Sequence, residues 1–254
     1  MLTVISPAKR LDFETEVCTE KHTIPDHLDR SELLINKLKR TSKAEIQKLM
    51  GLSTNLAELN VDRYASWTSD FNTGITKQAL LAFKGDVYRG MENDALSVED
   101  LDFAQEHLRI LSGLHGMLRP LDLIRPHRLE MGTNLAVNRK KDLYAFWGDT
   151  NVDRINEQLS SIGSDFLVNL ASNEYFKSVN TKKLRVKIIT PVFKDLKNDQ
   201  LRVISIFAKV ARGMMTGYIL RNRITQPEEL KLFDGGGYRY TENLSDDNIW
   251  VFTR

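Results

Sequence analysis

Short apolar runs separated by longer amphipathic segments constrain the fold more than any other feature of this sequence. Leu2–Ile5 and Phe166–Leu170 each have the length of one buried strand. Val98–Leu111 repeats apolar residues at helical spacing, and Ser97 can cap its N-terminus. Alternating strands and helices predict a mixed α/β (α+β) fold in one compact domain over residues 1–254, with a helical subregion at about 28–83. Further helices are predicted at 28–38, 42–50, 56–67, 75–83, 149–159 and 208–223.

Two segments rich in β-branched residues, Arg185–Val192 and Leu201–Phe207, flank the turn-like sequence KNDQ. This pattern predicts a β-hairpin over 185–207, which we expect to lie in the core. Two more short strands are expected near Tyr238 and Trp250.

The cysteine content and the lack of long apolar runs indicate where the protein works. The 254 residues include one cysteine, Cys18, so a disulfide framework is excluded and a reducing compartment is expected. The N-terminal MLTVIS is shorter than a signal-peptide core of about 7–15 apolar residues. No stretch approaches the ~20 apolar residues of a membrane helix. We therefore expect a cytoplasmic protein with no membrane partner.

Charge is unevenly distributed along the chain, although the net charge is only +2. Residues 177–223 contain twelve Lys or Arg and two Asp, whereas residues 85–106 contain seven Asp or Glu and one Arg. Each block is compatible with a solvated face that pairs across the surface. The basic block contains a predicted hairpin and helix, so we expect it to be ordered. An ordered basic face attracts phosphate backbones.

The sequence AEIQKLMGLSTNLA is similar to the helix-hairpin-helix pattern, in which Gly-apolar-Gly joins two helices. Gly51 permits a positive φ, and Leu52 is expected to plug between the helices. The first N–H groups of the second helix would then be free to bind phosphate. Lys43 and Lys48 add positive charge, and Ser53 replaces the second glycine of the pattern. An ordinary pair of core helices gives a similar pattern, so both interpretations remain open.

A glycine- and proline-rich segment at 111–132 carries three arginines, Arg119, Arg125 and Arg128. Arginines on a rigid loop suit phosphate binding because the guanidinium group forms paired hydrogen bonds with phosphate oxygens. Pairing with nearby carboxylates such as Glu130 is an equally open interpretation.

Residues with the pattern of a catalytic or metal site are few. Lys84 and Asp86 flank Gly85, and Glu174 lies one helical turn before Lys177. Such pairs are more often surface ion pairs than catalytic pairs. The five histidines lack HxxxH or HExxH spacing, and neither a P-loop nor GxGxxG is present. We therefore expect no metal and no cofactor.

Several long and unusual phrases together resemble the bacterial YaaA family of peroxide-stress resistance proteins. The similarity extends from the first residues to about residue 213 and is weaker beyond. The phrases are SPAK (6–9), AFKGDVY (82–88), LSGLHGMLRPLDLIRPHRLEMG (111–132), LYAFWGD (143–149), NLASNEYFK (169–177) and AKVARG (208–213).

The resemblance implies a compact α/β fold with a helix-hairpin-helix beside a positively charged cleft that binds DNA. It also implies a monomeric factor of the hydrogen-peroxide stress response that limits free iron and oxidative DNA damage. DNA binding is expected to be independent of sequence and to involve no catalysis. The residues implied in DNA binding are Lys9, Lys43, Lys48, Gly51, Leu52, Ser53, Lys84, Arg119, Arg128, Lys177, Lys209 and Arg212.

Two other functions remain open at this point. The first is an enzyme that acts on damaged or structured DNA. The second is a direct iron-binding protein that uses carboxylates and histidines. Candidate catalytic residues for the enzyme are Lys84, Asp86, Glu130, Asp149 and Glu174.

Overall fold

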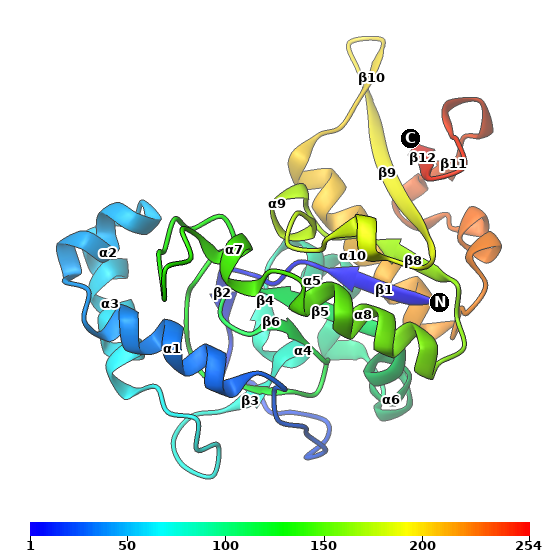
Figure 1. Ribbon diagram of the computed structural model, residues 1–254. Helices are drawn as coiled ribbons and strands as arrows, with labels where there is room; N and C mark the ends of the chain where they lie inside the picture. The colour runs from blue at the N-terminus through cyan, green and yellow to red at the C-terminus, as the bar shows by residue number, and fades with distance from the viewer.

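A strand from the start of the chain lies in the middle of the largest sheet. The computed structural model describes residues 1–254, and its sheet has the order β11-β12-β9-β8-β1-β5-β6, with β10 paired to β9 (Figure 1). Strands β12, β9, β8, β1 and β5 run parallel to their neighbours in this order, and β6, β10 and β11 are antiparallel. The strands are β1 (Leu2–Ile5), β5 (Leu108–Ser112), β6 (Gly116–Leu118), β8 (Phe166–Asn169), β9 (Lys187–Lys197), β10 (Gln200–Arg202), β11 (Arg239–Tyr240) and β12 (Ile249–Thr253).

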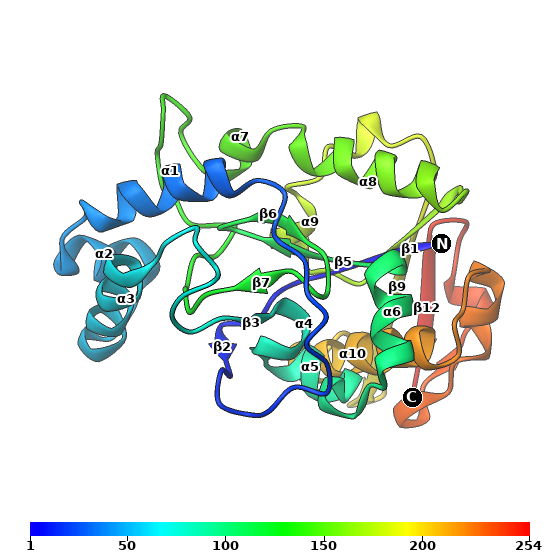
Figure 2. The ribbon, with the colours of Figure 1, turned by 90° about the horizontal axis from the view of Figure 1, so that it is seen from below.

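Helices cover both faces of this sheet because its central strands are apolar on both sides. Leu2 and Val4 of β1 belong to one hydrophobic cluster and Ile5 to the other. Figure 2 shows α1, α7 and α8 above the sheet and α5, α6 and α10 below it. The domain therefore has three layers, with the sheet between two layers of helices and one hydrophobic cluster on each side of the sheet. The helices are α1 (Leu28–Lys39), α2 (Lys43–Met50), α3 (Thr54–Ser66), α4 (Ala79–Ala82), α5 (Asp86–Met91), α6 (Val98–His107), α7 (Leu143–Trp147), α8 (Thr150–Ser161), α9 (Asn173–Phe176) and α10 (Ser205–Arg221).

Helices α5 and α10 touch through their backbones. A Cβ atom at Gly90 would overlap the Val210 carbonyl, and one at Gly213 would overlap the Val87 carbonyl. Neither glycine can be replaced without separating the helices. This contact fixes α5, which carries part of the largest cleft.

Two short two-stranded sheets lie outside the central sheet. β2 (Arg10–Leu11) pairs with β4 (Phe83–Lys84), and β3 (Lys77–Gln78) pairs with β7 (Leu123–Ile124). The first of these pairs brings the segment after β1 alongside the start of α5.

The predicted mixed α/β class is confirmed, and so are several local details. Ser42 caps α2 and Ser97 caps α6, each in a capping box. Gly51 ends α2 with φ +59°, in the left-handed region expected for this turn. None of the helices combines the length and apolar character needed to cross a membrane.

Some boundaries predicted from the sequence are wrong. The helix predicted over Val98–Leu111 ends at His107, and Leu108 begins the central strand β5. The helix predicted over Ile75–Phe83 contains only the single turn α4, preceded by β3. In both segments the apolar residues fit helical spacing, but pairing with distant strands determines the conformation.

The predicted hairpin exists, but only its first strand enters the core. β9 buries alternate side chains, whereas all three residues of β10 are exposed and α10 begins at Ser205. The second predicted strand, Leu201–Phe207, is therefore wrong in most of its length: only Leu201 and Arg202 belong to β10, and Ser205–Phe207 begin α10. Figure 1 shows the hairpin tip projecting from the body of the protein.

Candidate functional site

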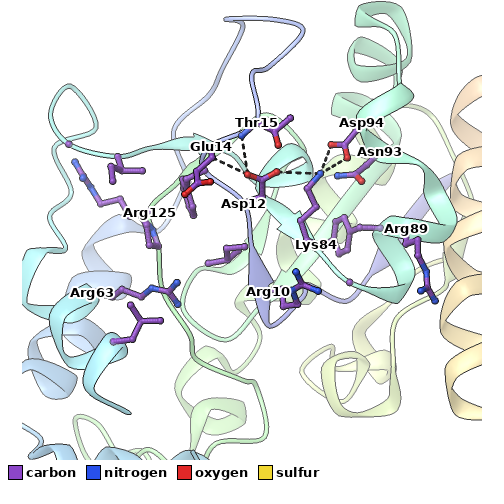
Figure 3. Close-up of a pocket in the computed structure, with 18 of the residues that line it drawn as sticks. Arg10, Asp12, Glu14, Thr15, Arg63, Lys84, Arg89, Asn93, Asp94 and Arg125 are labelled. Carbon is purple, nitrogen blue, oxygen red and sulfur yellow. Dashed lines mark hydrogen bonds and ion pairs between the residues drawn. The ribbon is translucent and has the colours of Figure 1, made fainter. Parts of the chain in front are cut away.

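The largest cleft has a volume of about 1430 Å³. Its walls come from α3, from the residues around β2, from the start of α5 and from the loops at 74–75 and 125–126. Figure 3 shows polar side chains from these elements directed into it. The β2–β4 pairing positions the cleft because it joins Arg10 to Lys84 in register.

The cleft is not predominantly basic. Carboxylates and cations are almost equal in number among its lining residues, so the cleft as a whole does not attract a polyanion. The carboxylates are Asp12, Glu14, Asp62, Asp86, Glu92 and Asp94, and the cations are Arg10, Arg63, Lys84, Arg89 and Arg125.

Lys84 lies between two carboxylates. Its Nζ forms ion pairs with Asp94 and, at 3.6 Å, with Oδ2 of Asp12, as the dashed lines of Figure 3 show. Hydrogen bonds from Thr15 and from the N–H of Glu14 hold the pKa of Asp12 below its usual range. Asp86 does not pair with Lys84, contrary to one sequence interpretation. It opens α5 and pairs with Arg89 at 3.1 Å, one helical turn away.

Two arginines of the cleft have no anionic partner. Neither Arg10 nor Arg63 forms a salt bridge, and no side-chain hydrogen bond satisfies either guanidinium group. Arg63 is half-buried, and this burial lowers its pKa. A cation removed from water without a counter-ion is unfavourable. In Figure 3 Arg63, from α3, and Arg10, from β2, both extend into the cleft.

A second group of charged side chains, here called the Glu130 cluster, comes from the segments after β1 and β8 and from the loop after β7. It consists of Lys9, Arg128, Glu130, Glu174 and Lys177. Glu130 accepts from Lys9 at 2.6 Å and from Arg128 at 2.9 Å. Burial opposes the ionisation of Glu130, but these hydrogen bonds prevail and its pKa is lowered.

Glu174 and Lys177 complete this cluster without pairing with each other. Glu174 accepts from the N–H of Gly132 at 2.9 Å, and the Lys177 ammonium lies 4.9 Å from the centre of the Tyr144 ring. Thus Lys9 and Arg128 are compensated by a carboxylate, and Lys177 is held by an aromatic face.

The other predicted residues are spread over the molecule. Arg119 pairs with Asp122 at 2.9 Å on a different part of the surface, and Asp149 pairs with Lys183 at 2.6 Å. Lys209 and Arg212 lie on α10 without salt bridges, and burial lowers the pKa of Arg212. Of the twelve residues predicted to bind DNA, only Lys84 lines the largest cleft.

The turn between α2 and α3 has the geometry expected from its sequence. Leu52 is 6% exposed and packs in the same hydrophobic cluster as both helices. Ser53 caps α3 by accepting from the Leu56 N–H. The N–H groups of Ser53, Thr54 and Asn55 have no backbone acceptor. Assignment of this unit as a helix-hairpin-helix nevertheless stays a prediction.

Lys43 and Lys48 lie on α2, beside this turn. Lys43 forms an exposed ion pair with Glu58 at 3.4 Å, and Lys48 has no carboxylate partner. Lys48 therefore leaves an uncompensated positive charge on α2, whereas the charge of Lys43 is offset by Glu58.

Two buried histidines lie beside the segment that joins the cleft to the Glu130 cluster. His127 follows the cleft residue Arg125 and shares a hydrogen bond with its carbonyl at 2.7 Å. Burial lowers the pKa of His127 to about 4 and that of His115 well below its usual value. Their rings meet edge to face, 5.3 Å between centres. No set of three or more His, Cys, Asp or Glu side chains is arranged to hold a metal ion.

Sequence reasoning missed most charged residues of the cleft, among them Arg10, Asp12, Arg63 and Asp94. A signal for two of them was available. Arg10 and Asp12 directly continue the phrase SPAK, which ends at Lys9. Arg63 and Asp94 come from other elements, so no local pattern joins them to this phrase.

Comparison with known proteins identifies the family of the chain. Residues 1–244 match the model of the family described as peroxide stress protein YaaA. Over all 254 residues the chain is 53% identical to a UPF0246 protein of Ralstonia pickettii and 51% identical to one of Colwellia psychrerythraea, each covered over 99% of its length. A UPF0246 protein of Teredinibacter turnerae is 53% identical over the same span. The chain therefore belongs to the YaaA family of peroxide stress proteins.

Proposed function

We propose that this protein binds DNA without sequence preference during hydrogen-peroxide stress and limits both free iron and oxidative DNA damage. The main support for this proposal is that most Lys and Arg side chains of the basic block, residues 177–223, have no carboxylate partner. Of the twelve Lys and Arg in residues 177–223, only Lys183, Arg221 and Arg223 form salt bridges. Six of the remaining nine leave a positive potential over β9, β10 and α10. These six are Lys187, Lys194, Lys197, Arg202, Lys209 and Arg212.

The turn between α2 and α3 supports the same proposal through backbone groups. Three adjacent N–H groups at the start of α3 lack backbone acceptors, and all three residues are exposed. The N-terminus of a helix favours phosphate through both its free N–H groups and its dipole. Such contacts carry no base identity, so they fit binding that is independent of sequence.

A titration of two unrelated duplexes over a salt series tests this proposal. Neutralising about four phosphates should give a slope of log K against log salt near ~ −3 to −4. Lys209→Ala should flatten the slope by about one unit for both duplexes. Lys231→Ala is the matched control, because Lys231 already pairs with Glu228 at 2.6 Å. Binding that ignores salt, or that differs strongly between the duplexes, would contradict the proposal.

The cellular part of the proposal has its own test. Deleting the gene should raise sensitivity to hydrogen peroxide, and a cell-permeable iron chelator should relieve it. Equal survival of the deletion strain and its parent would remove the support for this role.

A second candidate function, an enzyme acting on damaged or structured DNA, is favoured by one observation. The amine of Lys84 lies in the cleft between Asp12 and Asp94, an arrangement suited to proton transfer. Incubation with oxidised and mismatched duplexes, followed by product analysis, tests it. Product that disappears in Lys84→Met would support the enzyme, and intact duplexes would exclude it for those substrates.

A further inference from the structure

The cleft contains exposed apolar side chains beside its unpaired cations. Leu59 is 43% exposed and Ile75 is 62% exposed, and both line the cleft. Leu59 and Arg63 are four residues apart on α3, so they are neighbours on one face of the helix. An anion site next to an apolar surface is suited to a ligand with both an anionic and an apolar part.

The anionic part of the ligand is indicated by Arg10 and Arg63. Among the cations of the cleft, these two have neither a carboxylate partner nor a set of carbonyl acceptors. Lys84 and Arg89 have carboxylate partners, and the Arg125 guanidinium donates to the carbonyls of Thr68, Asp70 and Thr73. A guanidinium group can bind a phosphate through paired hydrogen bonds, so these two arginines are the candidates in the cleft for holding one.

The six carboxylates of the cleft argue against a duplex lying along it. A duplex carries about one negative charge per 1.7 Å of its axis, and so would place phosphates against these carboxylates. A ligand that places a single phosphate in the cleft avoids this repulsion. Its apolar part can lie against Leu59 and Ile75, as an unstacked base lies against apolar or aromatic side chains in single-strand sites.

We propose that the cleft binds one nucleotide unit, with its phosphate between Arg10 and Arg63 and its base against Leu59 and Ile75. This goes beyond the proposed duplex binding, since it needs neither the α2–α3 turn nor the basic block. The nucleotide unit is either free in solution or an unpaired residue of a DNA strand. The chemistry is the same in both cases.

The test uses the fluorescent 2-aminopurine deoxynucleoside monophosphate as the probe. It should bind the wild-type protein, and the nucleoside without phosphate and inorganic phosphate should each compete at least about tenfold more weakly. Arg63→Ala should weaken probe binding by about tenfold, a typical effect for a charged hydrogen bond. Leu59→Ala should weaken it by at least about threefold. Arg89→Ala is the matched control. Its affinity for the probe should change by less than about twofold, because Arg89 already pairs with Asp86.

Two duplexes of equal length and charge distinguish the sources of the nucleotide. Displacement of the probe by a duplex with one T·T mismatch, but not by the fully paired duplex, supports an unpaired residue of DNA. Displacement by neither duplex supports a free nucleotide. Absence of probe binding, equal effects of Arg63→Ala and Arg89→Ala in folded proteins, or equal competition by inorganic phosphate would overturn the proposal. Failure of duplex binding in the salt series would leave it intact, so the two proposals fail separately.

Discussion

The Glu130 cluster and the cleft beside it differ in how their cations are compensated. In the cluster, Glu130 holds both Lys9 and Arg128 at hydrogen-bond distance. In the cleft, Arg10 and Arg63 have no counter-ion, although Arg10 directly follows Lys9 in the chain. One region uses its charges for its own structure, and the other leaves charge available to a ligand.

This difference shows that a conspicuous cation is not by itself a binding cation. Lys9 and Arg128 belong to the most recognisable phrases of the sequence, yet a carboxylate neutralises them. The segment 125–130 joins the two regions, because it contributes Arg125 to the cleft and Glu130 to the cluster. His127, in the middle of this segment, allows both regions to be perturbed together.

Acid should give the largest effect on stability. His127 has an unfolded pKa near ~6.5 and a folded pKa of about 4. The unfolded chain therefore binds more protons at this residue between these values, so the contribution of His127 to stability falls as the pH drops from about 6.5 to 4 and then levels off. This one group should cost about 3 kcal/mol across the window.

Denaturant unfolding at several pH values checks this prediction. His127→Gln should flatten the pH dependence of the unfolding free energy, whereas the exposed His22→Gln should leave it unchanged. The same slope in wild type and His127→Gln would mean that His127 is not the titrating group.

Breaking the compensated cluster should give the next largest effect. Glu130→Ala leaves Arg128 and Lys9 without their acceptor, and Arg128 is only 16% exposed. Loss of hydrogen bonds to charged groups should lower the free energy of unfolding by about 2 kcal/mol. Glu58→Ala, which breaks the exposed pair with Lys43, should cost less than about 0.5 kcal/mol. A cost for Glu130→Ala no larger than this control would remove the distinction between compensated and free cations.

At the α2–α3 turn, the effect of backbone geometry on DNA binding can be measured without changing any charge. Gly51 has φ +59°, in the left-handed region that a Cβ atom disfavours, and no other atom lies within 4 Å of the place where that Cβ would stand. Gly51→Ala should therefore lower the free energy of unfolding by about 1 kcal/mol through backbone strain alone. Gly163→Ala is matched in φ and in open space and should cost the same. Only Gly51→Ala should also weaken duplex binding. Equal duplex affinity of the two variants would exclude the turn from the DNA surface.

Removing a free cation should give the smallest change in stability. Arg63→Met replaces a half-buried charge without a partner by an apolar side chain, so the unfolding free energy should stay within about 0.5 kcal/mol or rise. Arg128→Met should instead destabilise, since it leaves Glu130 with one donor fewer. Thermal unfolding of the two variants side by side measures this contrast. A large loss in Arg63→Met would show that Arg63 has a structural partner after all.

Local chemistry in the sequence predicts the parts of the fold that depend on neighbouring residues. Ser97 is identifiable as a cap and Gly51 as a turn, because each acts within about four residues of itself. The strand at Leu108 was not identifiable, because its apolar residues extend the pattern of α6. Its conformation comes from pairing with β1, about one hundred residues earlier.

The candidate site was less predictable than the fold for the same reason. The partners of Lys84 are Asp94, ten residues away, and Asp12, which is seventy-two residues away. On α3, Ala57, Asn60 and Tyr64 are buried, whereas Leu56 and Leu59 are exposed. Which side of α3 faces the core depends on α1 and on the loop at Arg128, whose carbonyl accepts from the Tyr64 hydroxyl.

The central place of β1 has a consequence for biosynthesis. β1 leaves the ribosome before its partners β5 and β8, which follow only about 100 and 160 residues later. At 5–20 residues per second, this apolar strand waits roughly 10 to 30 seconds before both its edges are paired. During that interval Leu2–Ile5 is a target for chaperones and for association with other nascent chains. Folding yield in the cell should therefore depend on how quickly translation reaches Asn169.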